Sequence, residues 1–227
     1  MTAPRCLIVS SRAWDPELPA RVAAKSGAVA QAICQRDELT VEAIAAFGPD
    51  WIFITHWSWK IPASIYSRWR CVMFHMTDLP FGRGGSPLQN LIACGFTETK
   101  VSAFRCTEGL DEGPVYLKEP LSLDGTAQEI YQRASAVIER MILSILTDAP
   151  ESRPQVGNPV IFERRRPEEG SIARLDDLDR VYDWIRMLDA DGYPPAFVDI
   201  GSLRLEFRCA KRSGDHVAAN VTIRRKP

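Results

Sequence analysis

Short apolar runs alternate with segments of helical periodicity through the first part of the chain. The runs Cys6–Val9, Trp51–Thr55 and Cys71–Phe74 are apolar almost throughout, which is typical of strands buried on both faces of a parallel sheet. Residues 17–25 and 41–46 between these runs have helical patterns. Strands and helices that alternate in this way predict a doubly wound α/β sheet.

The strand pattern continues further along the chain. Residues 100–106 and 115–121 favour two more strands, and the apolar positions from Ala127 to Ile145 recur with a period of 3.6, which predicts a long amphipathic helix. We therefore expect a Rossmann-like α/β core with a mixed, mostly parallel sheet over residues 1–148.

The remaining chain has a different organisation. Residues 148–158 are polar and contain two prolines, which indicates a linker. A helix is predicted over 175–188, followed by short strands near the C-terminus. Residues 149–227 are expected to form a small α+β unit that serves the substrate or an interface.

Composition and charge narrow the class of protein. The 227 residues are 45% hydrophobic and 25% charged, as in ordinary globular proteins. A formal net charge of -1 argues against a nucleic-acid partner. No stretch approaches the roughly 20 apolar residues of a membrane span, and Cys6–Val9 is too short for a signal peptide. We expect a cytoplasmic protein with no membrane partner, with reduced cysteines and no metal site.

One histidine and one aspartate stand out as candidates for chemistry. His75 follows an apolar strand and precedes a loop with three glycines, and Asp111 lies in a turn between two predicted strands. Ligands of doubly wound sheets bind beyond the carboxyl ends of the strands, so His56 and His75 should share a crevice. A structural histidine and a turn-forming aspartate are the simpler interpretations of these two residues, and both stay open.

Two segments and a third loop nevertheless form a specific pattern. The first has His75, Thr77, Leu79-Pro80, Arg83-Gly84 and Ser86-Pro87, and the second reads Glu108-Gly109-Leu110-Asp111-Glu112-Gly113-Pro114. Together they resemble the folate-dependent formyltransferases, in which a similar spacing separates the histidine from the aspartate. The segment 59–62 resembles the loop that holds the pterin in that family.

The resemblance implies the roles of particular residues. The catalytic pair would be His75 and Asp111, with N10-formyltetrahydrofolate as co-substrate. The asparagine of the family motif is replaced by Met73, so His56 and Asn90 are the candidates for the missing hydrogen-bond donor. The resemblance implies that the co-substrate is bound by Trp59, Lys60, Ile61, Pro62, Leu79, Thr107, Glu108 and Leu110. It implies that the acceptor is bound by Thr77, Asp78, Phe81, Arg83, Gly84, Gly85 and Tyr193.

The C-terminal segment is used to predict the acceptor. Residues 164–170, 185–188 and 192–197 are similar to segments of sugar N-formyltransferases, and the branch that makes formylated pseudaminic acid is the most similar. We expect transfer to a nucleotide-linked amino-deoxy sugar for bacterial surface polysaccharide, and no tRNA acceptor, because a large C-terminal barrel and a basic surface are missing.

Two alternatives remain: a formyltransferase on a small amine of the siderophore hydroxyornithine type, or a non-catalytic relative that binds folate or a nucleotide sugar. A homodimer through Trp184 and the terminal strands is left open.

Overall fold

The structure is a computed structural model that describes residues 2–12 and 15–226. Its contacts divide the chain into two compact units. The core unit comprises residues 1–83, 99–121 and 132–161, and the tail unit comprises residues 84–98, 122–131 and 162–227. The tail unit thus takes two segments from within the predicted core, and the predicted boundary at residue 148 stays a prediction.

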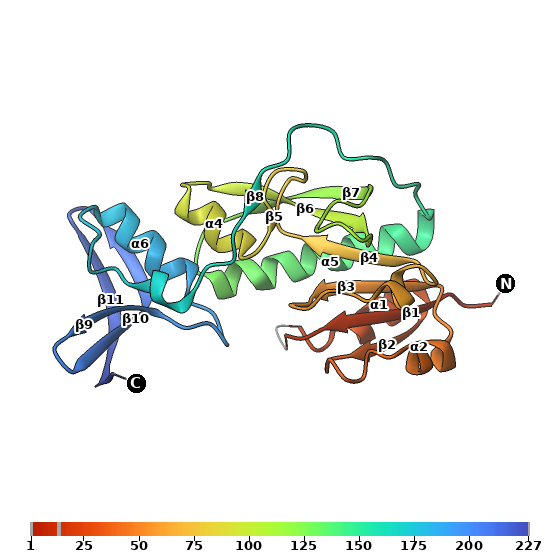
Figure 1. Cartoon of the computed structure of the whole chain (residues 1–227), viewed down its shortest axis with the longest axis horizontal. Helices are drawn as coiled ribbons and strands as arrows, with labels where there is room; N and C mark the ends of the chain where they lie inside the picture. The colour runs from red at the N-terminus through yellow and green to blue at the C-terminus, as the bar shows by residue number, and fades with distance from the viewer. Residues whose placement is uncertain (1, 13–14, 227) are drawn as a thin grey trace. The chain divides into compact units, whose positions relative to one another are not determined.

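A six-stranded sheet with the order β2-β1-β3-β4-β6-β7 is the centre of the core unit (Figure 1). Its strands are β1 (Arg5–Ser10), β2 (Val29–Ile33), β3 (Trp51–His56), β4 (Cys71–His75), β6 (Glu98–Arg105) and β7 (Val115–Ser122). The pairs β1–β2, β1–β3 and β3–β4 are parallel, whereas β4 and β6 are antiparallel. The prediction of a mixed, mostly parallel Rossmann-like sheet is confirmed.

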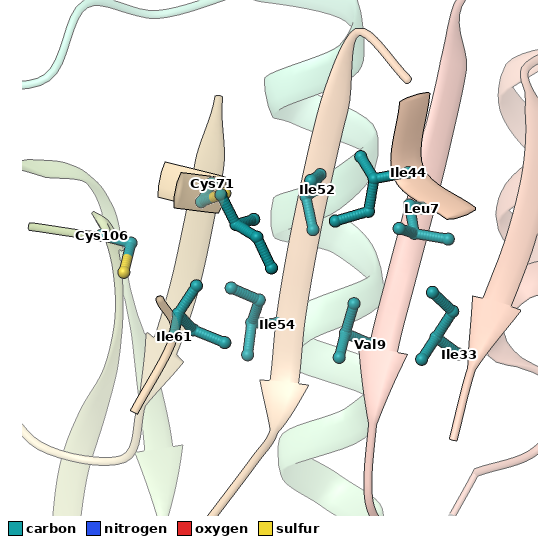
Figure 2. Packing of buried hydrophobic residues seen from close by; sticks show 10 residues of the cluster. Leu7, Val9, Ile33, Ile44, Ile52, Ile54, Ile61, Cys71 and Cys106 are labelled. Atoms are coloured by element: carbon teal, nitrogen blue, oxygen red, sulfur yellow. The ribbon is translucent and has the colours of Figure 1, made fainter. Parts of the chain in front are cut away.

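Alternate residues of β1 and β3 point to opposite faces of this sheet. Leu7 and Val9 of β1 lie in a buried cluster with Ile44 and with Ile52 of β3 on one face (Figure 2). Removal of such side chains from water, about 25 cal/mol per Å² of apolar surface, favours burial of both faces. This explains why the strands have no polar alternation.

Three helices lie between these strands, and the first two begin and end within one residue of the predicted ranges. They are α1 (Leu18–Ser26), α2 (Val41–Phe47) and α3 (Ala63–Tyr66). Thr40 caps α2 by accepting a hydrogen bond from the Ala43 amide at 3.1 Å. Gly48 ends α2 with a φ of 62°, a backbone conformation that favours glycine.

The longest helix, α5 (Ala127–Asp148), has its larger part in the core unit. It lies across the sheet on the face opposite the cluster of Figure 2. Glu139 of α5 accepts from Arg21 at 2.7 Å and from Lys25 at 2.6 Å, both on α1. These ion pairs fasten α1 to α5 on that face.

The tail unit is built around a small antiparallel sheet with the order β11-β10-β9. Its elements are α4 (Pro87–Ala93), the 3₁₀ turn η1 (Pro167–Gly170), α6 (Leu178–Met187), β9 (Ala196–Ile200), β10 (Leu203–Ser213) and β11 (His216–Arg225). The prediction of a small α+β C-terminal unit is confirmed. Among the described residues, no helix is long and apolar enough to cross a membrane.

The glycine-rich loop contains a short strand that the sequence did not indicate. β5 (Arg83–Gly84) pairs with β8 (Ile161–Phe162). The Arg83 amide donates to the Val160 carbonyl at 3.0 Å. A Cβ on Gly84 would lie 2.4 Å from the Phe162 carbonyl oxygen, so glycine is needed there for a close backbone approach.

Candidate active site

His75 and Asp111 lie face to face in the core unit. The Nδ1 atom of His75 is 3.7 Å from Oδ2 of Asp111, and both side chains are about nine-tenths buried. The Nε2 atom of His75 lies 2.7 Å from the Gly82 carbonyl oxygen. A carbonyl only accepts, so Nε2 carries a hydrogen and donates it. Nδ1 is therefore the nitrogen presented to Asp111.

The backbone holds Asp111 in an uncommon conformation. Its φ is 52°, in the left-handed region that non-glycine residues seldom occupy. The turn closes against β6, because the Arg105 amide donates to the Pro114 carbonyl at 2.9 Å. At Gly113 a Cβ would lie 1.7 Å from the Arg105 carbonyl oxygen. Glycine at 113 is thus a steric requirement of the turn that presents the carboxylate.

A buried serine that the sequence analysis missed fastens the loop after His75. Ser102 of β6 is paired with His75 in the sheet. Its hydroxyl donates to the Thr77 carbonyl at 2.7 Å and accepts from the Leu79 amide at 3.2 Å. Thr77 and Leu79 are both fully buried. These two predicted ligand-binding residues therefore lie inside the core unit around the histidine rather than on its surface.

The residues predicted to hold the pterin divide into buried and exposed members. Ile61 belongs to the buried cluster of Figure 2, and Pro62 occupies the position directly before α3. Trp59 is 39% exposed and meets Trp57 edge to face at 5.0 Å between ring centroids. Lys60 is exposed as well. The exposed indole of Trp59 is the flat apolar surface of this loop.

The segment before Asp111 packs against that loop, because Cys106 lies in the same buried cluster as Ile61. Burial raises the pKa of the Cys106 thiol to about 11. Leu110 is 64% exposed and Glu108 is exposed, whereas Thr107 is partly buried.

His56 has different surroundings from His75. It lines a cavity of about 170 Å³ together with residues of the β1 and β2 ends, including Ser10, Arg12 and Gln35. Burial lowers the pKa of His56 to about 4, and the positive charge of Arg12 contributes. His56 is therefore neutral at neutral pH. The residues that line this cavity do not include His75.

Met73 stands at the position of the family asparagine and is partly buried. It pairs with Ile54 of β3 and Phe104 of β6, and it packs against the buried cluster.

Three residues predicted for the acceptor lie in the same loop of the core unit. Asp78 is held between Lys100, at 2.9 Å, and Lys118, at 2.5 Å. Phe81 is partly buried, and its amide donates to the Asp78 carbonyl at 3.1 Å. Arg83 pairs with Glu112 at 3.2 Å. Intramolecular partners thus occupy the charges of Asp78 and Arg83.

The remaining candidates lie in the tail unit. The Asn90 amide donates to the carbonyls of Gly85, at 3.0 Å, and Glu163, at 2.9 Å. A Cβ on Gly85 would lie 2.6 Å from the Arg164 backbone. Gly84 and Gly85 thus allow the backbone of residues 162–164 to approach closely. Tyr193 stacks on Tyr131, with ring centroids 5.9 Å apart, and their hydroxyls are 3.0 Å apart.

A glutamine from the predicted linker completes the surroundings of Asp111. Gln155 donates from Nε2 to the carbonyls of Asp111 and Gly113, both at 2.8 Å. The Pro154-Gln155 dipeptide carries no local signal of this role, because the contacts span more than 40 residues. The described residues contain no group of three or more potential metal-ligating side chains.

Known proteins resemble the whole chain. A methionyl-tRNA formyltransferase from Clostridium thermocellum, solved as a structure, is 42% identical with a TM-score of 0.95, and the match covers 98% of this chain and 100% of that one. HypX from Aquifex aeolicus, solved in complex with tetrahydrofolic acid, is 19% identical with a TM-score of 0.79 over 94% of this chain and 39% of that one. The second likeness shows the fold alone.

Curated sequences add relatives of greater length. A methionyl-tRNA formyltransferase from Gluconobacter oxydans is 30% identical over 78% of this chain and 59% of its own length. The chain spans between 47% and 59% of the first three such relatives.

These findings correct two predictions, the sugar acceptor and the absence of a nucleic-acid partner. Residues 167–224 match the family model described as the C-terminal domain of methionyl-tRNA formyltransferase, so the tail does not indicate a sugar enzyme. The charge argument was wrong because net charge is a sum over the chain. Residues 203–226 alone contain seven basic residues and two acidic ones. The pseudaminic acid branch likewise finds no support.

A second family model matches the N-terminal part of the chain. The model described as formyl transferase matches residues 2–146, which include His75, the Asp111 turn and the 59–62 loop. The match covers more than half of the chain and agrees with the fold and with the motifs read from the sequence. The chain belongs to the formyl transferase family.

Proposed function

We propose that this chain transfers the formyl group of N10-formyltetrahydrofolate to the amino group of methionyl-tRNA. The observation that carries the proposal is the full-length match to the Clostridium thermocellum enzyme, together with the buried pair of His75 and Asp111. The match of the tail to the C-terminal domain of the same class of enzyme supports the acceptor.

The paired imidazole and carboxylate suit the chemistry of formyl transfer. The amine nitrogen attacks the formyl carbon, the new C–N bond forms, and the bond from carbon to N10 breaks in a second step. The intermediate carries an oxyanion, and the attacking nitrogen must lose a proton. We assign oxyanion stabilisation to His75, and acceptance of the ammonium proton to Asp111. The proton is finally delivered to N10 of the departing tetrahydrofolate.

The distance between the two groups supports these roles. A separation of 3.7 Å is too long for a direct hydrogen bond between Nδ1 and Oδ2. A reacting atom or a water molecule that lies beside the pair can contact both groups at hydrogen-bond distance. The imidazolium form of His75 can donate from Nδ1 while Nε2 stays on Gly82, and the Asp111 carboxylate is its counter-charge.

We assign the folate to the exposed surface of Trp59 and Leu110. An aromatic face beside an exposed apolar side chain fits a flat pterin ring. The packing of Ile61 and Cys106 in one buried cluster supports a location beside the turn that contains Asp111. The complex of HypX with tetrahydrofolic acid is consistent with folate binding on this fold.

We assign the terminal nucleotide of the acceptor to the cavity that contains His56. The cavity lies at the carboxyl ends of β1 and β3, where the chain order reverses from β2 on one side to β4 on the other. Ligands of doubly wound sheets bind at such a reversal. Arg12 supplies a positive charge there for a phosphate, and the Asp15 carboxylate in the same lining pairs with Arg21 at 2.5 Å.

We assign contacts with the tRNA backbone to β10 and β11. Seven basic residues lie in residues 203–226, and five of them pair with carboxylates. Pairing with carboxylates reduces the positive potential of these strands, so the electrostatic contribution to tRNA binding should be moderate.

The test is incubation of the chain with N10-formyltetrahydrofolate and methionyl-tRNA, followed by mass analysis of the released aminoacyl group. Formylmethionine is the expected product. The His75→Asn variant should lose on the order of 100-fold or more in kcat, with folate binding retained. Consumption of the donor only with other amines, and no formylmethionine, would overturn the proposed acceptor.

A further inference from the structure

We propose that Gln155 is a positioning residue that holds Asp111 and the His75 loop in register for formyl transfer. The inference rests on the proposed function, because it concerns the geometry of the same site. Gln155 lies in a segment without helix or extended strand, in which sequence patterns predict only a linker.

The backbone beside Gln155 is fixed to the core unit. Arg153 and Val115 form an isolated antiparallel bridge, with amide-to-carbonyl distances of 2.9 Å and 2.7 Å. Val115 begins β7, directly after the turn that contains Asp111 and Gly113. The segment is therefore held next to this turn before the side chain of Gln155 makes any contact.

The side-chain amide of Gln155 uses its full hydrogen-bonding capacity. Its nitrogen donates to the Asp111 and Gly113 carbonyls, both at 2.8 Å. Its oxygen accepts from Nε of Arg83 at 3.2 Å and from Nη2 at 2.8 Å. The reverse orientation would place the amide oxygen against two carbonyl oxygens and the nitrogen against a guanidinium, so only one orientation is compatible with these partners.

Through these bonds Gln155 connects the two halves of the catalytic pair. On one side it fixes the backbone of Asp111, whose φ of 52° must be maintained by its surroundings. On the other side it holds Arg83, the neighbour of Gly82, whose carbonyl accepts from His75 at 2.7 Å. These contacts connect Asp111 through Gln155 and Arg83 to Gly82, and so provide a second, indirect connection between Asp111 and His75 beside their direct separation of 3.7 Å.

The chemistry of the Gln155 side chain does not support a direct role in the reaction. Its amide neither gains nor loses a proton near neutral pH, and its polar atoms are occupied by protein groups. Its effect on the reaction must therefore pass through Asp111 and Gly82. A displacement of about 1 Å at a catalytic group can cost up to 100-fold in rate.

The experiment compares Gln155→Met, Gln155→Glu and the control Val156→Ala. Methionine keeps the length and approximate volume of glutamine but donates no hydrogen bond. Glutamate can still accept from Arg83, but its oxygens oppose the carbonyls of Asp111 and Gly113. Val156 is 89% exposed, so its truncation should leave the rate unchanged. The kinetic constants for both substrates, the folate Kd and the thermal midpoint are measured on each full-length variant.

We expect both Gln155 variants to lose about 10- to 100-fold in kcat, with KM and the folate Kd changed by less than about threefold. Because the effect passes through Asp111, Gln155→Met should lower the single-turnover rate by less than about twofold in an Asp111→Asn background. A kcat equal to that of the wild type, or the same loss in both backgrounds, would overturn the inference.

A purely structural role has a different signature. It predicts a lower thermal midpoint with an unchanged kcat per folate-binding site, and that outcome also overturns the inference. A wild-type chain that forms no formylmethionyl-tRNA would instead refute the proposed function. Hydrolysis of the donor by water, which gives formate and tetrahydrofolate, then supplies the rate on which the Gln155 variants are compared.

Discussion

Replacement of Gly113 by alanine tests the structural basis of the Asp111 turn. The new Cβ would lie 1.7 Å from the Arg105 carbonyl oxygen, so the backbone must move by more than about 1 Å to reach van der Waals contact. That movement weakens two hydrogen bonds, one from Arg105 to Pro114 and one from Gln155 to Gly113. At about 1 kcal/mol for each bond, plus about 1–3 kcal/mol for overpacking, the expected loss in unfolding free energy is about 3–5 kcal/mol.

Urea unfolding of Gly113→Ala against Gly109→Ala measures this cost. At Gly109 the added Cβ would lie 2.1 Å from a terminal carboxylate oxygen of Glu112, which can rotate away, so this control should lose less than about 1 kcal/mol. Stabilities of small domains are about 5–15 kcal/mol, so the Gly113 variant should unfold at a clearly lower urea concentration. Equal unfolding midpoints for the two variants would refute the steric argument.

Three further predictions concern pH, the acceptor and salt. Hydrogen bonds from Arg21 hold the pKa of Asp15 below its ordinary value. The resulting stabilisation is present above the unfolded-state pKa and is lost as pH falls through the folded-state pKa, so the urea concentration at the unfolding midpoint should decrease when the pH is lowered from about 6 to about 3. The decrease should be smaller in Asp15→Asn. Arg12→Gln should raise KM for methionyl-tRNA by about tenfold with little change in kcat, and an equal rise in the folate KM would contradict the assignment of the cavity. Lys211→Glu and Arg225→Glu should each weaken binding of methionyl-tRNA and reduce its logarithmic salt slope by about 1, and unchanged binding would place the tRNA elsewhere.

Several features of the fold could be predicted from local patterns. The apolar runs around Leu7, Ile52 and Val72 correspond to β1, β3 and β4, because a strand buried on both faces tolerates no polar position. The cap at Thr40 and the glycine at 48 bracket α2 for reasons that concern adjacent residues only. The helical period that begins at Ala127 likewise corresponds to α5.

The motif of the site also lies in the sequence, but its geometry does not. The spacing of His75 and Asp111 within the family pattern identified both residues, and they lie 3.7 Å apart. The shared crevice expected for His56 and His75 was not found around the cavity at His56. Strand ends on one edge of a sheet are close, but the direction of each side chain depends on packing that no local pattern encodes.

The proposed role of Gln155 and the need for glycine at position 84 depend on tertiary contacts alone. Gln155 meets Asp111 across 44 residues, and Gly84 is needed because the Phe162 carbonyl approaches it. The near-zero net charge concealed the excess of basic residues within 203–226. Hydrophobic periodicity and turn chemistry act between near neighbours in the chain and can be read along it. Distances between remote segments arise only when the chain folds, so positioning residues require the tertiary structure, whereas a local excess of charge can be counted along the chain.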